Sequence, residues 1–365
     1  MFMRARPGLF LLLPLLCTAV ASAQQSTLPT QLDDGKIYLD VVVTSKSGPP
    51  VAGLQQQDFT LLDNKVPRPI TSFRALGRSQ APLEVILVVD AVNATYESVA
   101  YERGQIEKFL RADGGHLAHP TALAVFTDDG MQIQEGFSDD GNALSASLDQ
   151  HVVGLRSIRH SAAFYGAVER FQLSLFALRQ LAAREATRPG RKIILWVSPG
   201  WPLLSGPEVD LDPKQQQDLF QDIVSISSTL LQAHITLYSI DPLGNADFDT
   251  RAFYYLAFLD GVREPRQVNV GDLALQVLAT QSGGLALAIN NDVAAMLQQC
   301  IADTDAYYEL TFDPPSGAKR DEYHSVEIKL SNSALTARTR QGYYAQPEIK
   351  EPRKVPIVES PTKSR

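Results

Sequence analysis

Between residues 83 and 304 the chain alternates short apolar runs with longer amphipathic stretches, and this alternation constrains its fold most strongly. The apolar runs are LEVILVVD (83–90), TALAVF (121–126), RKIILWVS (191–198), ITLYSID (235–241) and GLALAI (284–289). The helix candidates are 98–112, 142–152, 162–185, 214–233, 271–282 and 291–303. Continuous apolar strands separated by amphipathic helices predict a mainly parallel sheet with helices on both faces. We therefore expect a doubly wound α/β domain over 81–304.

Strand-like sequence flanks this domain on both sides. Before it, residues 37–75 are rich in β-branched side chains and alternate in polarity. After it come three further strand patterns, YYELTFDPP, YHSVEIKLS and LTARTRQGYYA. Three strands are too few to fold alone, so we expect the segments 24–80 and 305–345 to form one small β-sandwich into which the α/β domain is inserted. The tail, 346–365, is proline-rich and charged, which predicts a disordered extension.

The first 23 residues have the pattern of a secretory signal peptide. Two arginines precede an apolar core, LFLLLPLL, and the segment ends in the cleavage-site pattern Ala-Ser-Ala at Ala23. The core is too short to span a bilayer as a helix. Cleavage near Ala23 predicts a secreted or periplasmic protein without a transmembrane span. A lipid anchor at Cys17 would require a small residue before the cysteine, and Leu16 stands there.

Composition and cysteine content exclude several classes of function. The chain has 33 basic and 41 acidic residues, a net charge of −8, and no basic cluster outside its extreme ends, which argues against nucleic-acid binding. It contains neither a phosphate-binding P-loop nor a dinucleotide fingerprint. After the signal peptide only Cys300 remains, so an internal disulfide and a multi-cysteine zinc site are excluded. Cys300 lies in a helical pattern, where a buried apolar role is expected.

Several motifs, in their order and spacing, carry a family resemblance. They are LEVILVVD, VFTDDGMQIQEGFSDD, GRKIILWVSPG, LYSIDPLG, ATQSGG and AYYELTFDPP. The sequence resembles the bacterial family of secreted proteins with a "VWFA-related" domain, best known from Acidobacteria, over nearly the whole mature chain. No single motif is very specific, but the series is. The resemblance implies a von Willebrand factor A-like fold whose ligand site lies at the carboxyl ends of the strands, where loops of an open parallel sheet converge.

The resemblance also implies a metal-ion-dependent adhesion site, whose first loop is D-x-S-x-S. Asp90 matches the acid of that motif. The two serines fall on Val92 and Ala94, which have no side-chain oxygen, while Asn93 and Thr95 are one residue out of step. Magnesium and similar hard cations need several oxygen ligands. The first loop therefore retains only part of the expected ligand set.

The other two metal loops are further from the family pattern. The second-loop threonine aligns with Ala162, with Ser161 as a displaced neighbour, and the third-loop aspartate aligns with Pro199. Of five expected oxygen ligands only Asp90 is in register. We expect no cofactor and take Asp90 to position the loop that follows it. The alternative is a divalent cation such as Mg²⁺ bound at Asp90.

The segment around Ser198 resembles the nucleophile motif of a hydrolase but lacks two features that the motif needs. WVSPG matches the G-x-S-x-G nucleophile elbow at two of its three fixed positions, and Asp241 and His324 follow in the chain order of a hydrolase triad. However, Trp196 replaces the first glycine. Pro199 has no backbone N–H to donate to an oxyanion hole. We expect no catalytic residues.

Two polar pairs have simpler explanations than chemistry. His116 and His119 lie between a glycine pair and a proline, which indicates a surface loop and not a pair of metal ligands. Asp139 and Asp140 precede the helix expected over 142–152, so one of them is expected to cap that helix.

Aromatic residues offer candidate contacts for a partner. Trp201 and the AFYYLAF run at 252–258, which includes Tyr254 and Tyr255, are candidate exposed anchors. The run lies in the unusually long connection 241–270, which is typical of a functional insertion such as a protein-contact surface. A small local helix packed on the sheet also explains it, and both interpretations stay open. The pairs Tyr307-Tyr308 and Tyr343-Tyr344 lie in strand patterns, where one of each pair should face the core.

Two functions from different classes follow from these features. The favoured one is a non-catalytic interaction module that binds a protein or a cell-envelope component through loops at the carboxyl edge of the sheet. The alternative is an exported hydrolase that uses Ser198 or a divalent metal at Asp90. The candidate partner contacts are Asp90, Asn93, Thr95, Ser161, Ser198, Trp201, Tyr254 and Tyr255.

Overall fold

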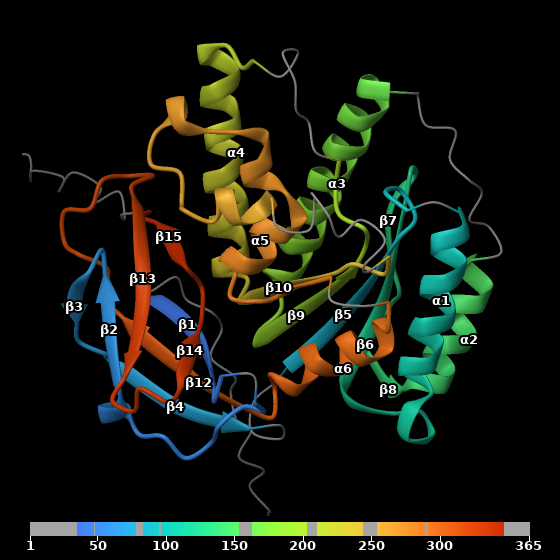
Figure 1. Cartoon of the computed structure of the whole chain (residues 1–365), viewed down its shortest axis with the longest axis horizontal. Coiled ribbons are helices and arrows are strands. Elements are labelled where there is room, and N and C mark those ends of the chain that lie inside the picture. The colour runs from blue at the N-terminus through green and yellow to red at the C-terminus, as the bar shows by residue number, and fades with distance from the viewer. Residues whose placement is uncertain are drawn as a thin grey trace, which may run out of the picture. The chain divides into compact units, whose positions relative to one another are not determined.

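A computed structural model describes residues 35–46, 48–77, 83–94, 96–152, 163–202, 210–243, 254–288 and 291–346 (Figure 1). The predicted signal peptide and nearly all of the predicted tail lie outside these ranges, as do Thr95 and Ser161. Within them, no helix is both long and apolar enough to cross a membrane.

A seven-stranded sheet forms the centre of the α/β part (Figure 1). Its order is β11 (Ala286–Leu287), β10 (Ile235–Ile240), β9 (Arg191–Val197), β5 (Leu83–Asp90), β6 (His116–Thr127) and β7 (Gly130–Ile133), and β8 (Ser138–Asp140) also pairs with β6. The first five strands are parallel, and β7 and β8 run antiparallel to β6. The prediction of a mainly parallel sheet is confirmed.

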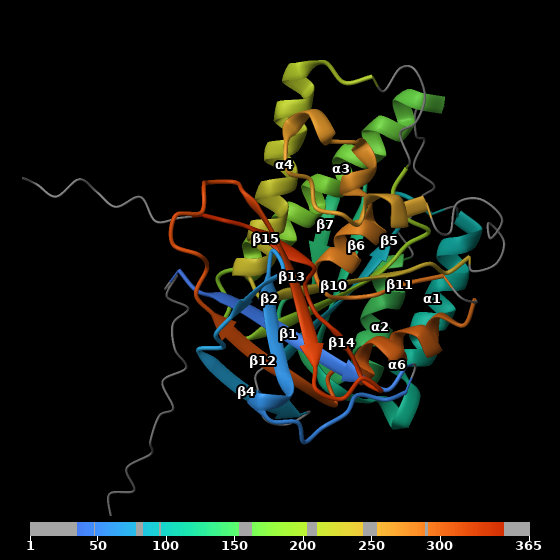
Figure 2. The same ribbon diagram turned by 60° about the vertical axis from the view of Figure 1, so that its left-hand side comes forward.

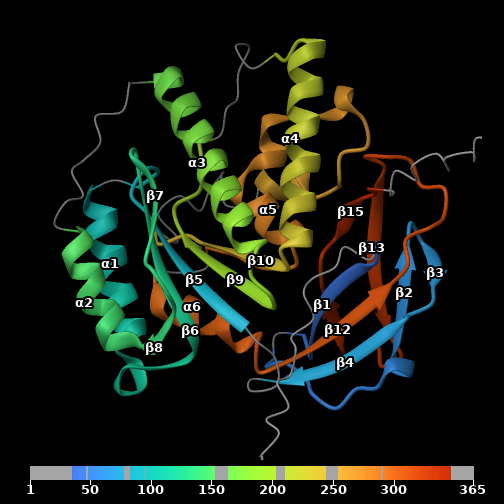
Figure 3. The same cartoon turned by 180° about the vertical axis from the view of Figure 1, so that it is seen from behind.

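Helices cover both faces of this sheet (Figures 1 and 3). One face packs on α3 (Ala163–Glu185), α4 (Pro213–Gln232) and α5 (Leu275–Gln281), and the other on α1 (Tyr96–Leu110), α2 (Gly141–Val152) and α6 (Val293–Ala302). Along β5, Ile86 and Val88 face the first layer, while Leu87 and Val89 face the second. Because successive strand residues point to opposite faces, two covered faces require the continuous apolar runs seen in the sequence.

Strands from the two ends of the chain share two antiparallel sheets (Figure 2). One has the order β14 (Thr336–Arg338), β1 (Ile37–Thr44), β12 (Ala306–Phe312), β4 (Ser72–Gly77), and the other β15 (Gly342–Tyr344), β13 (Tyr323–Leu330), β2 (Phe59–Asp63), β3 (Val66–Arg68). In the register, Ile37 lies opposite Phe312, and Asp63 opposite Val326. One apolar cluster contains side chains of both sheets. The C-terminal strands therefore complete sheets begun by the N-terminal segment.

Short 3-10 helices occupy several connections. They are η1 (Gln56–Asp58), η2 (Ala112–Gly115), η5 (Tyr254–Phe258), η6 (Pro265–Gln267) and η7 (Val270–Leu273). The helix predicted over 271–282 is in fact η7 followed by the shorter α5, which begins at Leu275. Of the strand predicted over 284–289, the structure describes 284–288, and within that part Ala286 and Leu287 pair with β10.

His116 is exposed, as predicted, but both histidines lie on a strand and not in a loop, and the surface position predicted for His119 is wrong. β6 begins at His116, and His119 is buried, with Nε2 at 2.7 Å from the Thr304 hydroxyl. The glycine pair does form a turn, since Gly114 and Gly115 have φ of 73° and 87°, but this turn ends just before His116. Pro120 is accommodated because the pairing of β6 with β8 is irregular at that point.

Three smaller predictions have clear outcomes. Asp140 caps α2, because its Oδ1 accepts the Ala143 N–H at 3.0 Å. Cys300 is fully buried, and burial raises the pKa of its thiol. One tyrosine of each pair, Tyr308 and Tyr343, packs in the cluster shared by the two antiparallel sheets, as predicted. The other two, Tyr307 and Tyr344, are also buried, but in other apolar clusters.

Candidate functional site

Three polar residues lie where neighbouring parallel strands end. Asp90 is the last residue of β5, Ser198 follows β9 and Asp241 follows β10. These strands are adjacent and parallel in the sheet, so their carboxyl ends share one edge. We call this place the carboxyl edge.

The Asp90 carboxylate is fully buried and accepts hydrogen bonds from four N–H donors. Its Oδ1 accepts the backbone N–H groups of Val92 (3.0 Å) and Asn93 (2.9 Å). Its Oδ2 accepts the side-chain amide of Asn93 (2.8 Å) and the indole N–H of Trp196 (3.0 Å). Burial raises the pKa of Asp90, and hydrogen bonds from the Asn93, Trp196 and Ser198 side chains oppose that shift. Asp90 thus orders the loop that follows β5.

The indole of Trp196, which donates to Asp90, is held in place by two aromatic neighbours. Trp196 has no exposed surface, and its ring meets those of Phe126 and Trp201 edge to face, at centroid distances of 5.9 Å and 5.5 Å. Trp201 is itself only 4% exposed. The expectation of an exposed ring at Trp201 is therefore wrong, because this ring packs against Trp196 in the apolar core.

Asn93 connects the edge to α3. Its side-chain amide donates to the Ser174 hydroxyl at 2.9 Å as well as to Asp90, and Ser174 in turn donates to the carbonyl of Arg170 at 2.7 Å. Of the predicted loop residues, the structure therefore brings Asp90, Asn93 and Ser198 together. Thr95 and Ser161 lie outside the described residues.

The structure does not assemble the hydrolase triad. Ser198 has no exposed surface, and its hydroxyl accepts the Gly200 N–H at 3.1 Å. Asp241 accepts the Leu243 N–H at 2.9 Å. His324 lies on β13 in an antiparallel sheet, where its Nδ1 is 2.7 Å from Oδ1 of Asp63. The histidine thus has its own carboxylate partner away from the carboxyl edge.

Glu102 of α1 is a member of the edge that no sequence motif singled out. It is fully buried, and neither of its carboxyl oxygens has a hydrogen-bond partner among the residues that the structure describes. Burial raises its pKa to about 9, and the nearby carboxyls of Asp90 and Asp241 add to the shift. The sequence could have revealed Glu102 by its spacing, because it lies at helical spacing between Val99 and Ile106, on the apolar side of α1 that faces the sheet.

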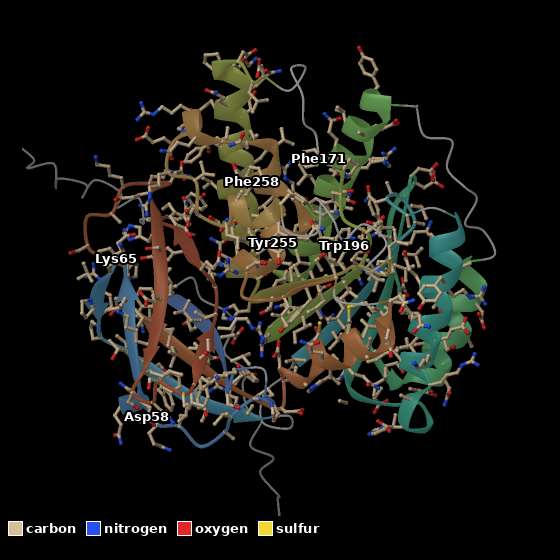
Figure 4. All side chains as sticks on the ribbon, viewed as in Figure 1. Asp58, Lys65, Phe171, Trp196, Tyr255 and Phe258 are labelled. Carbon is tan, nitrogen blue, oxygen red and sulfur yellow. The ribbon has the colours of Figure 1, made fainter. Side chains whose placement is uncertain are left out.

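η5 forms a rim beside this edge, next to α5 and η7 (Figure 4, which labels Tyr255 and Phe258). The Tyr254 hydroxyl donates to Oε1 of Gln276 on α5 at 3.4 Å. The same glutamine covers Gly200, where an added Cβ would lie 2.4 Å from its Nε2. Tyr254 and Tyr255 are partly buried, whereas Leu256 is 52% exposed. The 252–258 run is thus, in its described part, a short local helix with an exposed leucine.

Metal ligands are sparse throughout the described ranges, where no group of three or more histidine, cysteine, aspartate or glutamate side chains could hold a metal ion. At the carboxyl edge, both Asp90 oxygens already accept N–H donors. The side chains at Val92 and Ala94 add no oxygen ligand.

Neither a family model nor a curated protein matches the sequence. Solved structures give remote likenesses. The manganese-loaded TRAP protein of Plasmodium vivax has 11% identity and a TM-score of 0.34, covering 74% of this chain and 96% of that one. Human Sec24c, a COPII-coat protein, has 9% identity and a TM-score of 0.32 over 74% of this chain and 44% of its own. The pilus adhesin SpaC of Lactobacillus rhamnosus GG has 10% identity and a TM-score of 0.33 over 80% and 48%.

The chain thus spans less than half the length of Sec24c and SpaC. At these TM-scores the likenesses carry no argument about function, so the function has to be inferred from the residues of the carboxyl edge.

Proposed function

We propose that the chain is a secreted, non-catalytic von Willebrand A-like interaction module that binds a protein or cell-envelope partner at its carboxyl edge without a metal ion. The observation that carries this proposal is the set of four N–H donors around Asp90. These donors, two from the backbone and two from side chains, hold the carboxyl edge in place with the protein's own groups, in the position where a metal ion would otherwise act.

A divalent cation does not fit this arrangement. A hard cation would need a free Asp90 oxygen and further oxygens from neighbouring loops. Both oxygens of Asp90 are engaged, and the Trp196 indole is held rigidly against Oδ2 by its aromatic neighbours. Freeing that oxygen would leave an indole N–H buried without an acceptor, which costs about 1–3 kcal/mol.

A non-catalytic role is supported by the surroundings of Ser198. The hydroxyl is buried, the following Pro199 cannot donate to an oxyanion, and His324 is paired with Asp63. These features remove the general base and one oxyanion donor that acyl transfer requires.

A partner would contact the rim formed by η5. Leu256 is exposed there, and Tyr254 and Tyr255 lie beside it, held through Gln276 to the strand end at Gly200. Exposed aliphatic and amphipathic aromatic side chains are typical of the central contacts of protein interfaces.

The proposal includes the domain plan and the route of export. Segments 24–80 and 305–345 form a β-sandwich that carries the α/β domain, 81–304, and cleavage near Ala23 releases the chain from the membrane during secretion. The shared sheets and an apolar cluster that contains side chains of both support the sandwich.

Site-specific photo-crosslinking tests the contact surface. The photoreactive residue benzoylphenylalanine replaces Leu256 in one variant and, as a matched control, Val66 of β3, which is 51% exposed. We expect a discrete crosslinked partner from native envelope at position 256 only, unchanged by EDTA. Equal products at both positions, or none at 256, would refute the contact surface, and loss of the product in EDTA would refute metal-free binding.

A further inference from the structure

Arg340 is a buried arginine whose guanidinium has no partner in the described part of the chain. It lies between β14 and β15 and is 6% exposed. Among the residues that the structure describes, its guanidinium forms no hydrogen bond or ion pair, and the charge of Asp40 acts on it from beyond ion-pair distance. An arginine carries five N–H donors and a permanent charge, and a guanidinium with so little solvent contact gains from an acceptor placed against it. Such a group indicates a ligand.

The backbone holds Arg340 in this position. The N–H of Gln341 donates to the carbonyl of Gln281 at 3.1 Å. Gly283, with φ of 94°, passes so close that a Cβ there would lie 2.9 Å from the nitrogen of Arg340. The guanidinium is therefore directed by a fixed backbone.

Arg340 faces a small cavity of about 20 Å³. The cavity lies between β1 of an antiparallel sheet and β10 of the parallel sheet, and Asp40, His234 and Ser282 also line it. Because a cavity of at least ~10–15 Å³ holds one water molecule, this one has room for a single small ligand.

The charges around the cavity do not balance. Asp40 is the one carboxylate among its described lining residues, and Oδ2 of Asp40 is already paired with Nε of buried Arg191 at 3.2 Å. Burial lowers the pKa of His234, which leaves its imidazole neutral at pH 7. Among the residues that line the cavity, the one carboxylate available to Arg340 is thus already engaged by Arg191. Water would supply an acceptor for Arg340, whereas an anion supplies the acceptor and also the missing charge.

We propose that this cavity binds a single chloride ion, held by the Arg340 guanidinium, at the contact between the antiparallel strands and the parallel sheet. The ion would tie the C-terminal segment to β1 and to the start of β10. This inference is independent of the proposed function at the carboxyl edge.

Anomalous diffraction from the wild-type protein crystallised in sodium bromide tests the site directly. We expect an anomalous bromide peak within about 3.5 Å of the Arg340 guanidinium, since N–H donors contact a halide only slightly beyond ordinary hydrogen-bond length. Density for water in the cavity, without an anomalous peak, would refute the proposal.

A solution measurement uses thermal unfolding in chloride against gluconate at constant ionic strength. Ligand that binds only the folded state raises its stability, so chloride should raise the wild-type Tm by about 2 °C in a saturable manner. Arg340→Gln should abolish the difference. The control Arg266→Gln, at a 77% exposed arginine, should keep it. Equal wild-type Tm values in the two salts would contradict the proposal even if the Arg340 variant does not fold.

Discussion

Glu102 provides a sharp test of the buried carboxyl edge, through the change Glu102→Gln. The glutamate has no exposed surface and no hydrogen-bond partner within the described ranges, and burial beside Asp90 and Asp241 raises its pKa from 4.5 to about 9. Between these two values the folded protein keeps a proton that the unfolded chain has released. The contribution of Glu102 is therefore fully present below pH 4.5 and is lost progressively up to about pH 9.

The size of this effect follows from linkage. Each pH unit in that window lowers the free energy of unfolding of the wild type by about 1.4 kcal/mol, and the glutamine variant lacks this contribution because an amide does not titrate. The difference between wild type and variant should change by about 4 kcal/mol from about pH 5 to about pH 8, in favour of the variant at the higher pH.

Urea unfolding curves at several pH values measure this difference. Taking the difference between the two proteins cancels other groups that titrate in the same range, such as Asp272, whose pKa burial raises to about 6. Glu264→Gln, at an exposed position, should leave the wild-type slope unchanged. Parallel stability profiles for wild type and Glu102→Gln would refute the assignment of a buried protonated acid at this edge.

Three further substitutions test other contacts. Trp196→Phe removes one donor to Asp90 and part of a buried ring, and should lower the free energy of unfolding by about 3 kcal/mol in urea titrations; no loss would contradict a tightly held indole. Tyr343→Phe removes the hydroxyl that donates to Asp63 at 3.0 Å and should cost about 1.5–3 kcal/mol by the same assay, whereas an unchanged midpoint would exclude that hydrogen bond. Asp140→Ala removes the cap of α2 and should cost about 1 kcal/mol, with hydrogen exchange accelerated first in its opening turn.

The fold of the α/β part could be predicted because its strands are buried on both faces. In LEVILVVD and RKIILWVS nearly every side chain packs against one helical layer or the other, so the buried strands stand out as continuous apolar runs. The pairing of the N-terminal and C-terminal strands could be predicted because the three C-terminal strands are too few to fold alone. His119 was placed wrongly because its burial depends on Thr304, a partner far along the chain that no local pattern reveals.

The candidate site was predictable only in part. Asp90 was found from its place at the end of a strand, and its role in ordering the loop is the one expected. The role of Trp196 was missed, because the sequence shows it only as a bulky residue in place of a glycine, and its contact with Asp90 spans two strands. Trp201 looked like an anchor for a partner, but its burial depends on packing against that same indole.

The central claim is that the carboxyl edge is ordered by its own N–H donors and not by a cation. The most direct measurement is the electron paramagnetic resonance signal of free Mn²⁺ titrated with wild-type protein and with Asp90→Ala. We predict that the six-line signal of the free ion keeps its full intensity with both proteins at millimolar concentrations. A loss of signal with the wild type that Asp90→Ala restores would contradict the account.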